Sequence, residues 1–181
     1  MEFKPKYLVN VLDEVIGRVR YKMNAQNLLT GSDKPYFVYD TLPKFKERIA
    51  ATEKSGALKF RKYPLIYLQM PFTENYDVDY PLLYEVTCTI YILNRTRPEP
   101  NAERRYDDVF KPVLYPIFES LIEELGNQWD VQTGGKRKPL SYTKRDLMYW
   151  GDGEANVSTD IVDAIELTNL KIGILQGKNC T

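Results

Sequence analysis

Two basic clusters are the residues of this chain whose types and spacing could do chemistry. Guanidinium and ammonium groups bind phosphate and carboxylate, so the clusters predict a contact with acidic protein or DNA phosphate, or else a solvated loop face. The first cluster contains Arg95, Arg97, Arg104 and Arg105. The second contains Lys136, Arg137, Lys138, Lys144 and Arg145.

Catalytic chemistry has a narrower basis, because the chain has no histidine. This removes the commonest general base, the Ser-His and Cys-His nucleophile pairs and most zinc ligand sets. Asp77 with Asp79, or Asp160 with Asp163, could bind a hard cation, although lone acidic pairs in loops are usually solvated. The stretch "GGKRKP" at Gly134 lacks the spacer and the Ser/Thr of a phosphate-binding loop. We therefore predict no enzyme activity, no metal and no cofactor; the alternative is a carboxylate/metal-dependent enzyme such as a nuclease.

Composition limits the partners. Charge is balanced, with 25 basic and 25 acidic residues, so no global field draws the chain to nucleic acid or to a membrane. No apolar run approaches the roughly 20 residues that span a bilayer, and charges are scattered through the start, unlike a signal peptide. Cys88 and Cys180 are the only cysteines, which predicts no disulfide framework and fits a reducing compartment. We expect a soluble intracellular protein without membrane contact.

Aromatic side chains are frequent in stretches that are rich in turn residues. The chain has 14 tyrosines, and tyrosine is favoured at protein interfaces, where one end is apolar and the other polar. Core filling does not explain a loop that carries several aromatics within a few residues. We therefore predict a subunit or partner interface that includes Arg95, Arg97, Arg104, Arg105, Tyr106, Trp129, Tyr142, Tyr149 and Trp150.

Residues 106–125 place two prolines inside one amphipathic helical pattern. The apolar periodicity runs unbroken through Pro112 and Pro116, which favours one bent helix. Asp107 or Asp108 would cap its start, so that Pro112 lies near the tolerant first turn and Pro116 makes the kink. The alternative is a later helix start, with Pro116 in the first turn.

The spacing of apolar residues predicts the remaining elements. Helices are expected over 7–23 and 43–52. The last strand changes its apolar phase at Thr168 and Asn169, which predicts a β-bulge or a bend in one long strand. The expected strands are a short edge strand at 35–42, a short strand between Pro64 and Pro71, a long strand at 82–96 and the last strand at 160–175.

The order of these elements predicts an α+β fold. We expect an antiparallel or mixed twisted sheet of about four to five strands, packed against two main helices, with a long loop insertion. The chain is interpreted as a single domain, 1–181, with its core at about 5–127 and 160–176. The excursion at about 128–159 is expected to be loop-rich, and 97–108 is expected to be a loop.

Five phrases, in order, resemble virion proteins of tailed bacteriophages: "KYPLIYLQMPFTE", "YEVTCTIYILNRT", "ERRYDDVFKPVLYPIFESL", "YWGDGEAN" and "DIVDAIELTNLKIGI". The likeness is to head–tail junction proteins of the tail terminator or tail completion type. It implies a structural protein that forms a homo-oligomeric ring, often sixfold or else twelvefold. It also implies portal or adaptor and tail proteins as partners, with non-specific contact to DNA in the lumen.

The same resemblance implies a location in the virion, after assembly in the bacterial host cytoplasm. The alternative from another class is an adaptor or chaperone domain for virion assembly that binds one partner without forming a ring. Mass measurement in solution and within particles separates the two.

Overall fold

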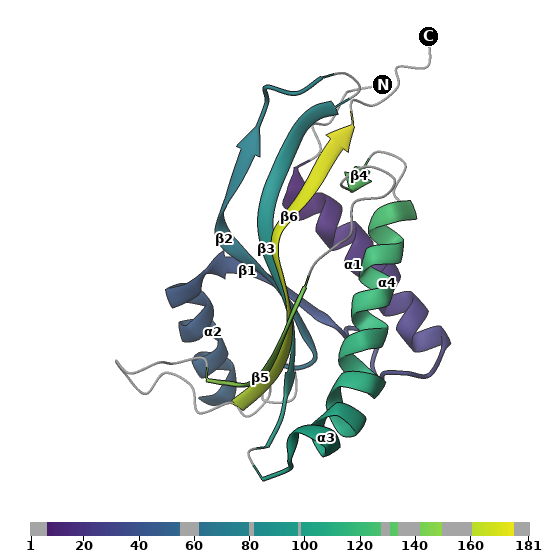
Figure 1. Cartoon of the computed structure of the whole chain (residues 1–181), viewed down its shortest axis with the longest axis vertical. Helices are drawn as coiled ribbons and strands as arrows, with labels where there is room; N and C mark the ends of the chain where they lie inside the picture. The colour runs from purple at the N-terminus through teal and green to yellow at the C-terminus, as the bar shows by residue number, and fades with distance from the viewer. Residues whose placement is uncertain are drawn as a thin grey trace.

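Helices cover both faces of one mixed β-sheet in the computed structural model of this chain (Figure 1). Helices α1 (Leu8–Ala25) and α4 (Tyr115–Asn127) pack on one face, and α2 (Leu42–Lys54) packs on the other. The expected α+β class is therefore confirmed. The structure describes residues 7–54, 62–79, 82–97, 99–127, 131–133, 142–149 and 161–175.

Within the described residues the sheet has six strands in five positions, in the order β1-β2-β3-β6 followed by β4 and β5, which both pair with β6. Strands β1 and β2 are parallel, and the other pairs are antiparallel. The expected mixed sheet is therefore confirmed, with a sixth strand because β4 and β5 share the position beside β6. The strands are β1 (Tyr36–Thr41), β2 (Leu65–Asn75), β3 (Leu82–Arg95), β4 (Val131–Thr133), β5 (Thr143–Tyr149) and β6 (Ile161–Leu175).

The pairing of β3 with β6 contains the predicted β-bulge. Cys88 lies opposite Leu170 and Ile90 lies opposite Leu167, so two residues of β6 face one residue of β3. One of the two, Asn169, has a φ of 53°, and both are exposed. The extra residue restores the phase, so apolar side chains on both sides of the bulge face the same core.

Strand β2 is longer than the sequence predicted. It continues through Pro71, where the strand was expected to end, and its register with β3 shifts between Gln69 and Thr73. Proline lacks the N–H that a regular ladder needs, but an irregularity of this kind tolerates it. Pro71 therefore marks a bulge inside the strand.

The long helix starts earlier than expected, inside the stretch 97–108 that was predicted to be a loop. It consists of α3 (Ala102–Arg105), the π-helical segment η1 (Tyr106–Leu114) and α4. Asn101 caps it, since its side chain accepts a hydrogen bond of 2.9 Å from the Arg104 N–H. The prediction of a cap at Asp107 or Asp108 was wrong.

Helical backbone continues without a break from Ala102 to Asn127, as the prediction of one helix had it. The α-helical part α4 begins at Tyr115 with Pro116 in its first turn, as the alternative had it. Pro112 lies inside η1, well beyond the first turn, and Pro116 is the second residue of α4. In η1 the Tyr115 N–H donates to the Phe110 carbonyl, five residues earlier, as in a π-helix. This wider turn accommodates a residue that cannot donate to the carbonyl four residues before it. The axis changes direction between α3 and α4 (Figure 1).

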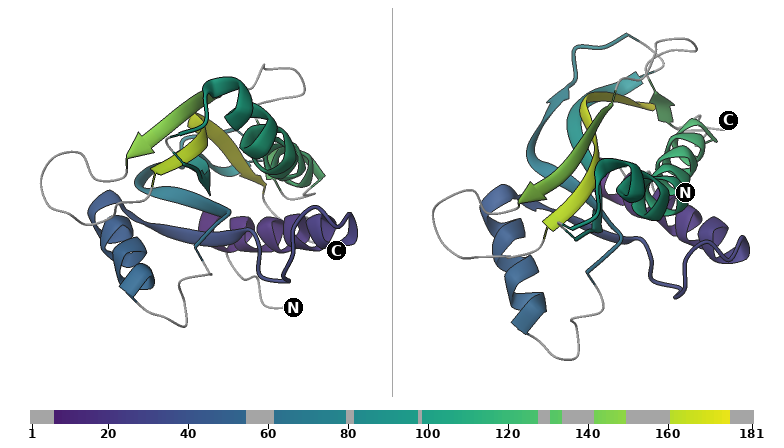
Figure 2. Two further views of the ribbon diagram at one scale, coloured as in Figure 1. Left: turned by 90° about the horizontal axis from the view of Figure 1, so that it is seen from below. Right: turned by 60° about the horizontal axis from the view of Figure 1, so that its bottom comes forward.

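The stretch 128–159 is not only a loop, because it contributes β4 and β5. Strand β5 runs antiparallel to β6, with Thr143 opposite Glu166 and Tyr149 opposite Ile161. Figure 2 shows β5 alongside β6 in both views. Part of the expected excursion is therefore built into the sheet.

Candidate functional site

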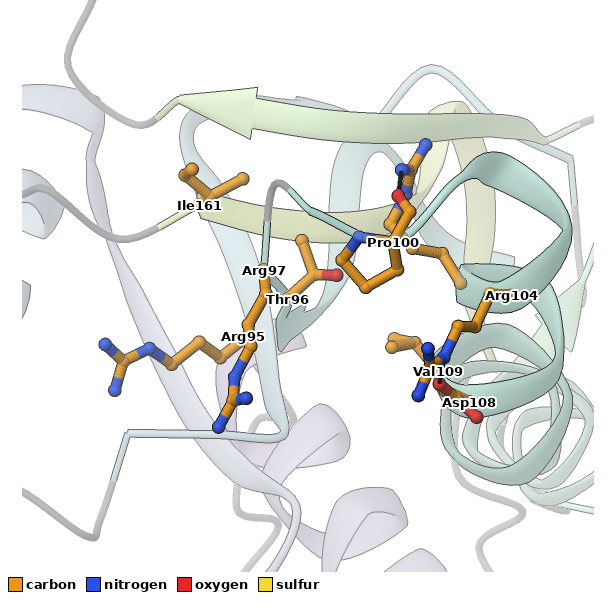
Figure 3. Close-up of a pocket in the computed structure, with 9 residues that line it drawn as sticks. Arg95, Thr96, Arg97, Pro100, Arg104, Asp108, Val109 and Ile161 are labelled. Carbon is orange, nitrogen blue, oxygen red and sulfur yellow. Dashed lines mark hydrogen bonds and ion pairs between the residues drawn. The ribbon is translucent and has the colours of Figure 1, made fainter.

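An arginine-lined pocket lies between the end of β3, the start of β6 and the first turns of the long helix (Figure 3). Its volume is about 580 Å³. Arg95, Arg97, Arg104 and Arg105 all line it, so the structure brings the four members of the first basic cluster to one place. Guanidinium groups gathered around a hollow favour a ligand with carboxylate or phosphate groups.

One wall of the pocket is the chain that leaves β3. The Thr96 N–H donates to the Ile161 carbonyl at 2.9 Å, which extends the contact of this chain with the start of β6. Thr96 is buried, whereas the side chains of Arg95 and Arg97 on either side of it are exposed. Because alternate residues of extended chain point the same way, Arg95 and Arg97 leave this wall on the side away from Thr96, whose side chain points toward Pro100 (Figure 3).

The opposite wall is the helix that Asn101 caps. Arg104 Nε lies 3.3 Å from Asp108 Oδ2, one helical turn later, and both side chains are exposed. Pairs of this kind contribute only about 0.3–0.5 kcal/mol. The pair instead matters for shape, because Arg104 and the Asp108 carboxylate stand together at the edge of the pocket. With Pro100 they form a ridge, which we call the α3 ridge.

Arg105 forms the floor of the pocket and is held by contacts within the chain. Its side chain is 8% exposed and that of Asp163 is fully buried, with 3.6 Å between Arg105 Nε and Asp163 Oδ1. Arg105 Nη1 also donates to the Pro100 carbonyl. Arg105 therefore differs from the expectation of a side chain offered to a partner. Asp163 also differs from its expected place in a solvated or cation-binding pair.

A second, shallower hollow of about 520 Å³ lies beside the arginine pocket and is acidic. It shares Pro100, Arg104 and Asp108 with the arginine pocket, so the two hollows flank the same ridge. This separation of charge was not predicted from the sequence, because the acidic and basic residues alternate along the chain. The carboxylates that line this acidic hollow, all exposed, are Glu99, Glu103, Asp107 and Asp108.

Two of the predicted interface aromatics are described with their side chains, and both are partly exposed. Tyr106 is 42% exposed and Tyr142 is 43% exposed. Lys144 Nζ lies 5.5 Å from the centre of the Tyr106 ring, and the Tyr142 ring lies 4.7 Å from that of Phe118. These contacts hold the two tyrosines against the rest of the chain and leave close to half of each side chain exposed.

The remaining three aromatics of the predicted interface, Trp129, Tyr149 and Trp150, have no described side chains. Tyr149 ends β5, and its side chain lies outside the described part of the structure. Trp129 and Trp150 lie outside the described residues. The same is true of Lys136, Arg137 and Lys138 in the second basic cluster.

A polar cluster on the α2 face joins β5 to β6. Tyr91 Oη donates to Glu166 Oε1 at 2.8 Å, and Arg145 Nε donates to the other oxygen of this buried carboxylate. Burial, together with the hydrogen bond to Glu166, raises the pKa of Tyr91 to about 12. The hydrogen bond to Glu166 also raises the pKa of Arg145. Arg145, expected on a basic loop, therefore stabilises a strand pairing.

The described residues give little basis for metal or thiol chemistry. Among them, no three acidic or cysteine side chains come together to hold a metal ion. Asp77 and Asp79 are exposed, and Asp160 lies outside the described ranges. Burial raises the pKa of the Cys88 thiol to about 12, so this side chain is not a thiolate near neutral pH.

Within the described ranges, none of the helices combines the length and apolar character needed to cross a membrane. Comparison with family models, with curated proteins and with solved structures gives no match to this chain.

Proposed function

We propose that this chain is a structural protein of a tailed bacteriophage virion, which forms a homo-oligomeric ring at the head–tail junction. The observation that supports this best is the surface around α3 and η1. There an arginine pocket, an acidic hollow and the half-exposed rings of Tyr106 and Tyr142 lie on neighbouring parts of one subunit. Tyrosine and arginine are the residue types enriched at the energetic centres of interfaces.

The proposed role is that of a neck, tail terminator or tail completion protein. The ring would contact portal or adaptor proteins on one side and tail proteins on the other, and DNA would pass through its lumen without sequence-specific contacts. The resemblance of the sequence phrases to this class of protein supplies the kind of assembly. On this proposal the protein works through its surfaces, without a catalytic centre or a cofactor.

A ring subunit must keep one conformation while neighbouring proteins bind to it. The sheet is covered by helices on both faces, and its two longest strands, β3 and β6, are fully paired with each other along the centre. The helix α4 packs beside α1 on the same face of the sheet, and Lys22 of α1 forms an ion pair with Glu123 of α4. A single rigid body of this type can present the same contact surfaces in every copy of a ring.

The test uses a bacteriophage that encodes this chain and a null allele of its gene. We expect purified wild-type particles to contain the chain, and null lysates to contain DNA-filled heads and free tails that fail to join. Electron microscopy counts the joined particles, and mass spectrometry of purified virions measures the chain. Complete infectious particles without the chain would refute the proposal.

The stoichiometry in the particle separates a ring from an adaptor. A ring subunit is present in several copies per virion, in a number that matches the symmetry of the neck. An adaptor or chaperone that acts without forming a ring is present once or is lost from mature particles. Quantitative mass spectrometry against the major capsid protein distinguishes these results.

A further inference from the structure

We propose that the arginine pocket binds the acidic hollow of a second copy of this chain, so that each α3 ridge lies between two subunits. This deepens the proposed ring function and rests on it. The ligand of the pocket is a set of carboxylates on a folded surface, and each copy supplies both the pocket and its ligand.

Separation of charge across one short ridge carries the inference. On one side, Arg95 and Arg97 are exposed at a hollow of about 580 Å³. On the other side, Glu99, Glu103 and Asp107 are exposed at a hollow of similar volume, about 520 Å³. Guanidinium and carboxylate groups pair through two parallel hydrogen bonds, which fixes orientation as well as attraction.

The charge balance of the whole chain favours a second copy over a polyanion. The chain has 25 basic and 25 acidic residues, so it carries no net field that would concentrate DNA around it. The acidic hollow directly beside the pocket would repel a phosphate backbone that ran across both. A surface with the opposite charge pattern meets no such repulsion, and this chain presents that pattern itself.

The two hollows are different surfaces of the subunit, although they share a ridge. Because they share Pro100, Arg104 and Asp108, symmetric pairing of two copies would satisfy both contacts in a dimer, whereas head-to-tail pairing repeats to form a closed ring or a filament. The proposed ring requires the head-to-tail arrangement. The pocket is also preorganised. Arg105 and Asp163 fix its floor, and the Asn101 cap fixes the start of the helix on its wall. The floor therefore needs little ordering when a partner binds, whereas the exposed arginines at the rim do become ordered.

The experiment uses the purified full chain and two charge reversals, one for each side of the contact. Arg97→Glu changes the pocket and Glu103→Lys changes the hollow. The matched controls are Arg18→Glu and Asp13→Lys, which make the same charge changes at exposed positions of α1. Sedimentation velocity up to millimolar concentration measures association, and circular dichroism checks that every variant is folded.

We expect the wild type to associate, more weakly as salt is added, and each pocket or hollow reversal to raise the dissociation constant at least about tenfold. An equimolar mixture of Arg97→Glu and Glu103→Lys should recover association, because the reversed pocket fits the reversed hollow. The controls should behave as the wild type. The ring proposal expects assemblies larger than dimers, and association that stops at a dimer would overturn the head-to-tail arrangement.

Several results would overturn the inference. These are a wild type that stays monomeric up to millimolar concentration, reversals that leave association unchanged, or a mixture that fails to recover it. If the wild type retains short duplex DNA, and Arg97→Glu abolishes this retention without affecting self-association, the pocket binds phosphate instead.

The experiments distinguish failure of this inference from failure of the proposed function. If the chain is required in virions but the reversals still assemble, only this inference is wrong; if association depends on the charges but null phage complete their particles, only the phage role is wrong.

Discussion

The buried ion pair at the floor of the arginine pocket gives the sharpest test of the fold around it. Asp163→Asn removes the carboxylate charge with almost no change of shape and leaves the Arg105 guanidinium in a site that is 8% exposed. Breaking one partner of a buried pair costs about 3–5 kcal/mol, because the remaining charge has lost its compensation. For a chain of 181 residues, this corresponds to a fall in melting temperature of about 10 °C.

The neighbouring pair supplies a matched control. Arg104 and Asp108 carry the same charges, but both side chains are exposed. Asp108→Asn should therefore cost no more than about 0.5 kcal/mol. The contrast between the two aspartates depends on burial, since the chemical change is the same in both.

Urea denaturation followed by circular dichroism measures the free energy of unfolding of each variant. The double variant Arg105→Met/Asp163→Leu should recover much of the loss, because two apolar side chains of similar volume leave no buried charge. Equal and small effects of Asp163→Asn and Asp108→Asn would refute the reasoning. A double variant as unstable as the sum of its singles would show that packing, and not the ion pair, holds the pocket floor.

Further predictions concern the helix start, the π-helical segment, the partly buried Tyr91 and the buried Cys88. Asn101→Ala removes the cap and should lower the unfolding free energy by about 1 kcal/mol, while Asn101→Asp should keep most of it. Pro112→Ala should raise the unfolding free energy, by less than about 3 kcal/mol because η1 already accommodates the ring; a lower value in urea denaturation would contradict this. The folded-state pKa of Tyr91 is raised from 10.0 to about 12, so the unfolded state loses this proton first as the pH rises. The free energy of unfolding should therefore fall between these two pH values, and Tyr91→Phe should reduce that fall in a pH series. In a Cys180→Ser background, a thiol reagent should label Cys88 only at the rate of unfolding, because burial raises its pKa to about 12.

The parts of the fold that could be predicted are those with a long, regular apolar pattern. Strand β3 alternates over most of its length, and the change of apolar phase at Asn169 is enough to predict the bulge in β6. Both strands lie at the centre of the sheet, where one or both faces are buried. Because the buried face accepts only apolar side chains, apolar and polar residues alternate along such a strand, and this alternation allows the strand to be predicted from the sequence.

Elements at the edges were harder to predict, because their residues follow local or distant partners. Strand β5 reads "TKRDLMY", and a strand with such polar residues is stabilised by its ladder with β6 and by the Arg145 contact to Glu166. The start of α3 follows two prolines, which obscured Asn101 as a cap, although Ala102 and Glu103 after it are good helix formers.

The candidate site was predicted in part. The four arginines were grouped because they are close in sequence, and the structure brings them to one pocket. Their roles depend on residues that are far away in the chain. Arg105 differs from Arg104 only because Asp163 lies beneath it, and the acidic hollow becomes separate from the pocket only when α3 forms between them.

The π-helical segment that contains Pro112 also determines where the arginine pocket lies relative to the core. The long helix has to bury Phe110 and Leu114 against the sheet and also has to bring Arg105 over Asp163 at the start of β6. A regular helix of this length keeps one direction, whereas the axis of this one changes between α3 and α4 (Figure 1). The π-helical segment that contains Pro112 lies between these two tasks. It allows α4 to follow the core while α3 reaches the pocket, so the irregular segment positions the very surface on which the proposed subunit contact depends.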